Sequence, residues 1–307
     1  MITKKIGLFF KDISILCLIV FLAVGVSGCT ATRQTVQKAV IPSLDTSVDD
    51  LVDKLTRQKN SDFVKEGLPG ALLFVTGLTE LAPTNYKLLS TISFLYAVCG
   101  LFIEDEDPDY AISLYEQGKD FGMRAMKVNN EKFRKEVESG IPVYEAAKFL
   151  TKDDLKAMTW YGVNYGKRVT LQLTTPDQIL GIPDFAATAK RSVELDPNYS
   201  WGVNWAILGI IYAIVPAMMD LGGGADTSGD AFANGNKAEN GEFGMMDVLA
   251  SRYLSPLLKD RDGYDQLNNR VIEMDPCKLE GGLCIVNELA KQKARFNLAN
   301  KAKYMGY

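Results

Sequence analysis

The residue types that most often carry catalysis are sparse in this chain of 307 residues. It has no histidine, which removes the commonest general base, the commonest metal ligand and every Ser-His or Cys-His nucleophile. Acidic residues are scattered on expected solvated helix faces or gathered at Glu104-Asp105-Glu106-Asp107. We interpret this cluster as a loop before a helix, with Asp107 as N-cap and Pro108 in the first turn. A calcium site is the alternative, but the spaced ligands and central glycine of a calcium loop are missing. We therefore predict no enzyme, no metal site and no cofactor.

The five cysteines have different expected roles. Cys17 lies in an apolar segment near the start of the chain, and Cys99 lies in an apolar run, where it is expected to be a small core residue. Cys277 and Cys284 are separated by a loop-like stretch and either form a local disulfide or remain two free thiols. Cys29 is the candidate for covalent modification.

The first 28 residues have the layout of a bacterial signal peptide. Three lysines near the start are followed by the apolar run Ile13–Val26 of 14 residues, whereas a membrane-spanning helix needs about 20. The quartet Val26-Ser27-Gly28-Cys29 then resembles a lipobox, in which a signal peptidase cuts before a cysteine that already carries lipid. An ordinary signal peptide, or a buried helix that ends in cysteine, is the alternative.

Lipid on Cys29 would hold the mature protein lastingly on a membrane, because each buried acyl methylene contributes about 0.8 kcal/mol. Residues 29–43 are polar and aperiodic, as expected of the flexible tether of a lipoprotein that carries palmitate. Residues 44–307 are the predicted folded domain. Thr30 in place of Asp after the cysteine favours the outer membrane over the inner, on the periplasmic side of the envelope.

Charge argues against nucleic acid as a partner. The formal net charge is −4, and it becomes −6 without residues 1–28, which hold three lysines and one aspartate. Phosphate binding needs a clustered basic surface, which a mildly acidic protein lacks. With 47% hydrophobic residues, the chain can bury a substantial core.

The elements that must position these residues are helices. Apolar residues recur at three- and four-residue spacing through most of the chain, alternating strand patterns are nearly absent, and about a dozen helices are expected. Helix starts are predicted from a capping box or from a capping side chain before proline. These starts are Thr151-x-x-Asp154, Thr175-Pro176, Asp196-Pro197 and Asp275-Pro276.

Two segments have competing interpretations. The apolar stretch Trp205–Met219, which contains Pro216, is too short for a span and is expected to be a core helix. The glycine-rich region that begins at Leu221 lacks the preceding strand and the Lys-Ser/Thr ending of a phosphate-binding loop. A flexible hinge or a tight turn between helices is the better interpretation.

Repeat signals predict the fold. Trp205-x2-Leu208-Gly209-x2-Tyr212 matches the first-helix pattern of a tetratricopeptide repeat (TPR) at every position, and Ala111-x3-Tyr115 is a degenerate second-helix signal. A repeat-closing proline recurs at Pro83, Pro197 and Pro276, at distances that fit units of roughly 38 to 40 residues rather than 34. We predict an all-α fold, a right-handed superhelix of cryptic, expanded TPR-like helix pairs. Generic helix pairs are the alternative.

Together these features resemble the T component of a tripartite ATP-independent periplasmic (TRAP) transporter, a family of lipoproteins with TPR-like repeats. The resemblance covers about residue 60 to the end. It is carried by the blocks Tyr115–Gly122, Trp160–Gly166, Val193–Tyr199, Trp205–Gly224 and Asn287–Ala299. Between Phe232 and Gly244, Gly and Asn interrupt the expected second helix, which departs from the family pattern.

The resemblance implies a helical body that forms a homotrimer and docks the periplasmic solute-binding P component, which serves a permease. Stacked helix pairs present a concave surface or channel, and we predict that it binds an apolar or amphipathic small molecule. The candidate residues for this pore are Trp160, Tyr161, Asn164, Tyr165, Trp201, Asn204, Trp205 and Tyr212. Trp205 and Tyr212 are also explained as repeat core. The alternative function is a non-transport scaffold, an adaptor lipoprotein of the outer-membrane assembly type.

Overall fold

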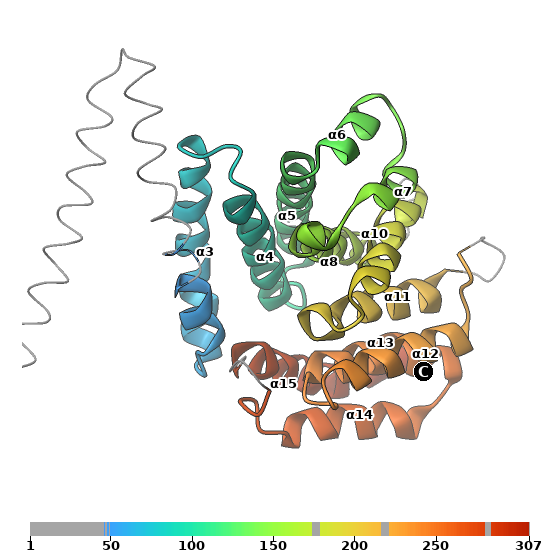
Figure 1. Cartoon of the computed structure of the whole chain (residues 1–307). Helices are drawn as coiled ribbons and strands as arrows, with labels where there is room; N and C mark the ends of the chain where they lie inside the picture. Colours follow the sequence, from blue (N-terminus) through green and yellow to red (C-terminus); the bar gives the residue numbers. More distant parts are fainter. Residues whose placement is uncertain are drawn as a thin grey trace, which may run out of the picture. The chain divides into compact units, whose positions relative to one another are not determined.

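A computed structural model describes residues 46, 48, 50–173, 179–215, 221–279 and 284–306 of the chain (Figure 1). The chain divides into two compact units, Met1–Val48 and Asp49–Tyr307. The expected signal peptide, Cys29 and the tether at residues 29–43 lie outside the described residues. All helices from Ser61 onward belong to the unit Asp49–Tyr307.

Helices make up the regular structure of the described residues, among which there is no strand, so the predicted all-α fold is confirmed. Their bounds are α3 Ser61–Gly77, α4 Tyr86–Ile103, α5 Pro108–Asn129, α6 Glu131–Glu138, α7 Val143–Ala146, α8 Leu155–Leu171, α10 Ile182–Leu195, α11 Val203–Ile214, α12 Ala225–Ala238, α13 Gly244–Leu258, α14 Arg261–Glu273, α15 Cys284–Ala299 and α16 Lys301–Met305. Short 3₁₀ turns are η1 Leu78–Glu80, η2 Ala147–Phe149, η3 Lys152–Asp154 and η4 Tyr199–Gly202.

Local capping chemistry places two helix starts where the sequence predicts them. Asp107 caps α5 by accepting the backbone N–H of Tyr110 at 3.0 Å, with Pro108 in the first turn. Thr151 and Asp154 form a capping box that leads through η3 into α8. In both places the side chain satisfies N–H groups that have no partner within the helix.

The predicted helix starts at Asp196-Pro197 and Asp275-Pro276 are wrong. Asp196 is the residue that ends α10, and its carboxylate accepts from the N–H of Asn198, two residues on. Asp275 accepts from Cys277 N–H in the same way. An Asx turn of this kind satisfies the same short-range hydrogen bond without a helix following it. The third predicted start, Thr175-Pro176, lies outside the described residues.

Successive helices pack closely, and glycines sit where they cross. A Cβ at Gly209 of α11 would lie 2.8 Å from the ring of Phe232 in α12, so the glycine of the TPR-like pattern does allow the close approach expected of it. In α5, a Cβ at Gly122 would lie 2.8 Å from Cβ of Tyr161 in α8. The backbone of both glycines is helical, a conformation that any residue can adopt. The close packing therefore depends on their lack of a side chain and not on the backbone freedom of glycine.

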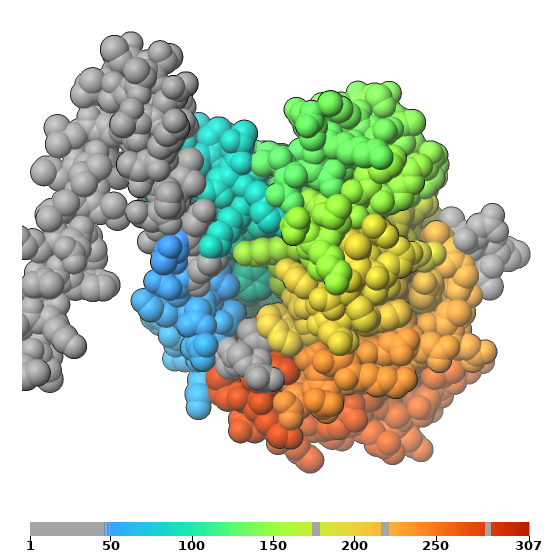
Figure 2. Space-filling model, viewed as in Figure 1, coloured from blue at the N-terminus to red at the C-terminus, as the bar shows by residue number. Residues whose placement is uncertain are grey.

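The last long helix, α15, lies beside α3, near the start of the folded unit (Figures 1 and 2). In Figure 2 the red C-terminal elements lie beside the blue elements that include α3. Gln292 of α15 donates to Ser61 Oγ of α3 at 2.7 Å, and Lys293 of α15 pairs with Glu104 at the end of α4 at 2.6 Å. Contacts between residues 189 and 231 positions apart thus connect the two ends of this unit.

Helix α4 is the core helix of the unit. It is long and apolar enough to cross a membrane by length and composition, but 78% of it is buried inside the structure, as expected of a core helix. Cys99 lies within it at 2% exposure, as expected of a small core residue. Burial raises the pKa of this thiol to about 11, which keeps it in the unreactive protonated form.

The apolar stretch after Trp205 forms α11, which is mostly buried, in agreement with a core helix; Pro216 lies outside the described residues. Beyond it, Gly224 N–H of the glycine-rich segment donates to Tyr212 O at 2.9 Å. Gly222 and Gly224 have φ of 75° and 151°, conformations that glycine adopts readily. Between Phe232 and Gly244, α12 continues through Gly235 to Ala238, and the interruption lies after it, where Asn240 and Gly241 have φ of 55° and 73°.

Candidate functional site

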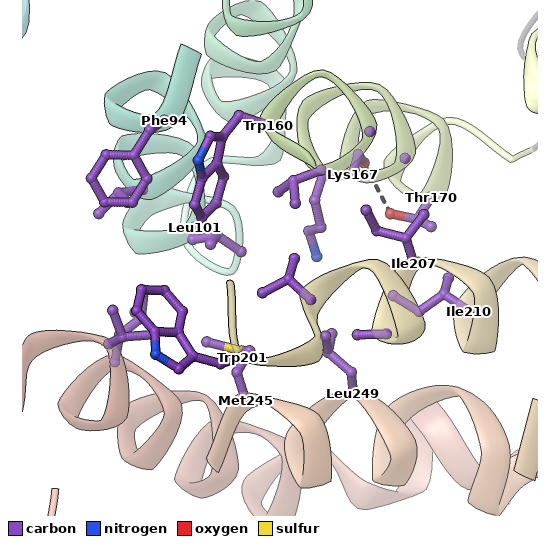
Figure 3. Close-up of a pocket in the computed structure, with 18 of the residues that line it drawn as sticks. Phe94, Leu101, Trp160, Lys167, Thr170, Trp201, Ile207, Ile210, Met245 and Leu249 are labelled. Carbon is purple, nitrogen blue, oxygen red and sulfur yellow. Dashed lines mark hydrogen bonds between the residues drawn. The ribbon is translucent and has the colours of Figure 1, made fainter. Parts of the chain in front are cut away.

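An apolar cavity of about 100 Å³ lies among α4, α8, α11, α13 and α15 (Figure 3). In each of the pairs α4/α5, α11/α12 and α13/α14, the first helix faces the cavity and the second lies outside it. Among the described residues, the wall consists of aliphatic and aromatic side chains, two glycines, and two polar residues, Lys167 and Thr170, both on α8. Such a surface can hold an apolar group but offers few directional contacts.

Trp160 and Trp201 are the two predicted pore residues that line this cavity. Trp160 lies on α8 with its ring centroid 4.6 Å from that of Phe94 on α4, at an interplanar angle of 57°. Trp201 comes from η4, and its ring centroid is 6.2 Å from that of Phe243. Figure 3 shows the two indoles on the same side of the cavity, one above the other.

An unusual backbone presents Trp201. Ser200, Trp201 and Gly202 have φ of 51°, 57° and 70°, so three successive residues are left-handed. This conformation costs roughly 1 to 2 kcal/mol for each non-glycine residue and tends to persist where the surrounding structure requires it. The turn carries the indole that lies on the cavity wall.

Three further predicted residues of α8 lie in the packing around it, outside the cavity lining. Tyr161 is 2% exposed and packs against Gly122. Asn164 is fully buried and donates to Ser93 O at 2.9 Å. The ring centroid of Tyr165 lies 5.2 Å from that of Phe185. Their role in ligand binding stays a prediction.

The remaining three predicted residues lie on α11, also outside the lining. Asn204 is buried and donates to Thr159 Oγ1 at 2.9 Å, which ties α11 to α8. Trp205 donates from its indole N–H to Pro197 O at 3.0 Å. Tyr212 is half-buried, with Lys190 Nζ 6.0 Å from its ring centroid. The structure therefore brings only Trp160 and Trp201 together at one cavity.

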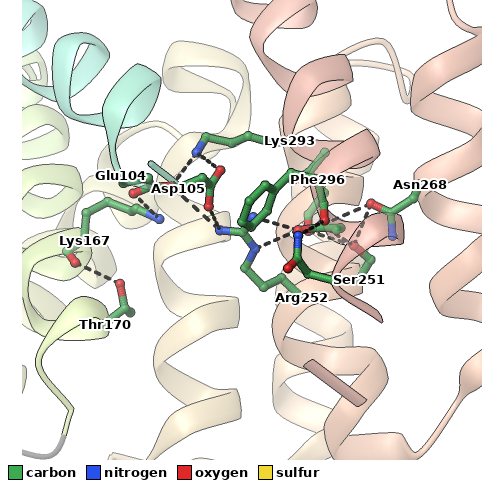
Figure 4. Close-up of polar contacts among 12 residues, drawn as sticks. Glu104, Asp105, Lys167, Thr170, Ser251, Arg252, Asn268, Lys293 and Phe296 are labelled. Carbon is green, nitrogen blue, oxygen red and sulfur yellow. Dashed lines mark hydrogen bonds and ion pairs between the residues drawn. The ribbon is translucent and has the colours of Figure 1, made fainter. Parts of the chain in front are cut away.

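A buried ion cluster adjoins the cavity (Figure 4). We call it the Glu104 cluster, and it consists of two carboxylates and three cations contributed by the end of α4 and by α8, α13 and α15. Glu104 Oε2 lies 2.8 Å from Lys167 Nζ, and Glu104 Oε1 lies 2.6 Å from Lys293 Nζ. Arg252 lies 3.2 Å from Asp105 and 3.8 Å from Glu104. Lys167 belongs to both the cluster and the cavity wall.

Comparison with protein families decides the identity of the chain. Residues 57–305 match the model of the TRAP transporter T-component. The chain belongs to that family. This confirms the resemblance that the order of its motifs indicates, and it makes the protein a T-component of a transport system. A comparison with curated proteins finds no match.

The electrostatics of the Glu104 cluster in this T-component follow from burial and pairing. Burial alone would raise the pKa of Glu104, but Lys167, Lys293 and Arg252 outweigh it and hold that pKa well below its ordinary value. Burial lowers the pKa of Lys293 despite Glu104, whereas for Lys167 the attraction of Glu104 exceeds burial and raises the pKa. Tyr115 donates its hydroxyl to Glu104 at 2.7 Å, and burial raises its pKa strongly.

Glu104 lies in the predicted loop before α5, but the sequence did not reveal its burial. It is 4% exposed, and the cations that pair with it are contributed by helices far along the chain. The sequence analysis also did not identify Lys167 as a buried residue of the site, because a lysine within a helix is usually a surface residue. The available signal was weak: a lysine one turn after Asn164 on a helix whose other residues are largely apolar or small.

Two other predictions about side-chain chemistry concern metals and thiols. Within the described ranges, no group of three or more cysteine or acidic residues could hold a metal ion. Cys277 and Cys284 are joined by a disulfide, the first of the two states left open by the sequence. The bond connects the turn after α14 to the first residue of α15, so it fixes the start of a helix that lines the cavity.

Proposed function

We propose that this T-component holds the apolar part of a transported solute in the cavity between α4, α8, α11, α13 and α15, and that it does so while docked to the solute-binding P component. The single observation that carries the proposal is an apolar cavity at the centre of a protein of this family. A mostly apolar pocket with very few polar groups is typical of sites for small apolar molecules.

We further propose that the helix pairs are expanded TPR-like units of a right-handed superhelix, and that the protein acts as a homotrimer. Support for the repeat comes from the pairs α4/α5, α11/α12 and α13/α14, in each of which the first helix faces the cavity, as expected when stacked repeats present one helix each to a concave side. The close contact of Gly209 with Phe232 gives further support. Sedimentation of the purified domain tests the trimer.

Lipid on Cys29 is the proposed anchor, which would keep the protein on the periplasmic side of the envelope, with the outer membrane favoured. It is supported by the lipobox at Val26–Cys29. Mass spectrometry of the intact protein from membranes should show an acylated N-terminus, and Cys29→Ala should release the protein from the membrane fraction. An unmodified Cys29 in membrane-derived protein would refute the anchor.

Docking is tested with the lipid-free protein, residues 30–307, as bait in periplasmic extract from its own bacterium. A TRAP-type solute-binding protein should co-purify, and mass spectrometry identifies it. Purified separately, the two proteins should then form a complex in solution. Recovery of outer-membrane assembly proteins in its place would contradict the transport role and favour the scaffold.

The two tryptophans test ligand binding. Trp160→Ala and Trp201→Ala should each weaken binding of an apolar probe such as 1-octanol by about tenfold, because truncating an aromatic ring on the wall removes a contact worth on the order of 1 to 2 kcal/mol. Isothermal titration calorimetry measures the affinity. Trp205→Phe is the matched control, since Trp205 lies outside the lining. Equal loss in all three variants would contradict the assignment of the cavity as the site.

A further inference from the structure

The Glu104 cluster does not balance its charge within the described residues. Lys167, Arg252 and Lys293 supply three cations, whereas Glu104 and Asp105 supply two carboxylates. The side chains of Lys167, Arg252 and Lys293 are 7%, 8% and 3% exposed. Because these side chains are buried, water can do little to stabilise the extra positive charge. A buried charge without a counter-charge destabilises the folded protein.

Lys167 is the member of this cluster that meets the cavity. It is the one charged residue that the described ranges contribute to the cavity lining, and Figure 3 shows its Nζ pointing from α8 toward α11. A lysine ammonium has three N–H donors, and the described part of the chain gives Nζ one acceptor, Glu104 Oε2 at 2.8 Å. Glu104 itself is shared with Lys293, Arg252 and the hydroxyl of Tyr115. Donor capacity is therefore left over at the cavity wall.

We propose that the cavity takes an amphiphile with a singly charged oxyanion head, such as an alkyl carboxylate, whose head pairs with Lys167 and whose tail lies against Trp160 and Trp201. One bound anion would bring the cluster and ligand together to zero charge. This inference rests on the proposed function, because it names the class of solute that the cavity holds.

The size of the cavity restricts the tail. A closed apolar cavity of about 150 Å³ is enough for a benzene ring, and the space here is about 100 Å³. A slender alkyl chain, part of which extends beyond the enclosed space through the open side of the cavity, therefore suits the site better than a fused ring system. Apart from Lys167, the polar residue on the wall is Thr170, whose hydroxyl already donates to Lys167 O at 2.9 Å. Neutral polar heads would find little to bind.

The test compares octanoate with 1-octanol, which has the same tail and an uncharged head, by isothermal titration calorimetry on the wild-type mature protein. Octanoate should bind about tenfold more tightly, because a charge-assisted hydrogen bond in a dry site is stronger than a neutral one. Lys167→Met should abolish this preference by lowering the affinity for octanoate to that for 1-octanol. The variant leaves two cations against two carboxylates, so it should fold; circular dichroism checks this, and Lys167→Gln is the second variant.

Lys65→Met is the matched control, because Lys65 pairs with Glu106 at the surface, away from the cavity. It should keep the preference for octanoate. Equal affinity of the wild type for both probes, or a preference that survives Lys167→Met or is lost in Lys65→Met, overturns the inference while leaving apolar binding intact. Binding of neither probe overturns the proposed function as well.

Discussion

At the scale of single residues, the protein buries several ionisable groups that the sequence presents as ordinary surface residues. Glu104 is compensated by three cations, whereas no described residue forms an ion pair with Glu239 at the end of α12. Glu239 is 6% exposed, and its Oε1 has no hydrogen-bond partner in the part of the chain that the structure describes. Burial, followed by repulsion from Glu242, raises the pKa of Glu239 to about 7. A carboxylate that must stay charged in this place destabilises the fold.

The pH dependence of Glu239 can be measured. Because its pKa rises from 4.5 to about 7 on folding, the folded state binds more protons, so stability falls as pH rises through that window and stays lower above it. Glu239→Gln mimics the protonated form. It should stabilise the protein at pH 8 by at most about 3 kcal/mol and have little effect at pH 4.5, as measured by urea unfolding.

The exposed residue Glu138 supplies the control, because Glu138→Gln removes one negative charge without a buried carboxylate. Its effect should be small at both pH values. A gain from Glu239→Gln that is the same at pH 4.5 and pH 8 would show that protonation of Glu239 is not its cause.

At the scale of helices, the spacing between elements depends on glycines at the crossings. Gly209 lets α12 bring Phe232 against α11, and Gly122 lets α8 bring Tyr161 against α5. Since α11 and α8 both line the cavity, each crossing holds a wall helix close against the helix outside it. By contrast, Gly67 and Gly70 in α3 have open space around the position of a Cβ, so their absence of a side chain is not used for packing.

Gly209→Ala should therefore destabilise the protein by about 1 to 3 kcal/mol, because a methyl group in a filled crossing forces the helices or Phe232 to move. Gly67→Ala is the matched variant in an open helical position, and it should stabilise by about 0.5 to 1 kcal/mol, since alanine loses less backbone entropy. Chemical denaturation measures both. If Gly209→Ala is neutral or stabilising, the crossing is looser than the structure shows.

At the scale of the whole folded unit, the Glu104 cluster joins segments that are distant in the chain. Glu104 and Lys293 are 189 positions apart and lie 2.6 Å from each other. Together with Lys167 and Arg252 they connect α4, α8, α13 and α15, which all line the cavity. The cluster and the cavity are thus two parts of one central structure, the first polar and the second apolar.

Removing the central carboxylate should be costly. Glu104→Gln leaves Asp105 as the one carboxylate against three cations, and breaking a buried ion pair costs roughly 3 to 5 kcal/mol. Glu106→Gln, two residues along, loses only the exposed pair with Lys65 and should cost less than about 1 kcal/mol. Thermal and urea unfolding at pH 7 compare them.

The pH dependence of the same group has a defined sign. Because pairing holds the pKa of Glu104 below 4.5, its stabilisation is complete above that pH and is lost as pH falls through the lower folded value. The difference between wild type and Glu104→Gln should therefore shrink on acidification below pH 4.5. Comparable losses for Glu104→Gln and Glu106→Gln at pH 7 would contradict the burial of the cluster.

Local and repetitive features could be predicted from the sequence. Helical periodicity, the Asp107 cap and the Thr151 capping box depend on interactions within a few residues, and the structure confirms them. The order of the aromatic and glycine motifs was sufficient to indicate the family. An aspartate before a proline can either start a helix or form an Asx turn. At Asp196 and Asp275 the sequence predicted a helix start, but the structure has an Asx turn.

Only the tertiary structure decided which of the eight aromatic and amide candidates meet. It places Trp160 and Trp201 on the cavity wall and the other six in contacts outside it. It also decided the state of Glu104 and the place of Lys167. The physical reason is that burial and charge compensation depend on which helices pack together. That packing is determined by contacts over the whole unit, such as the one between Glu104 and Lys293. No short stretch of sequence contains both partners of such a contact.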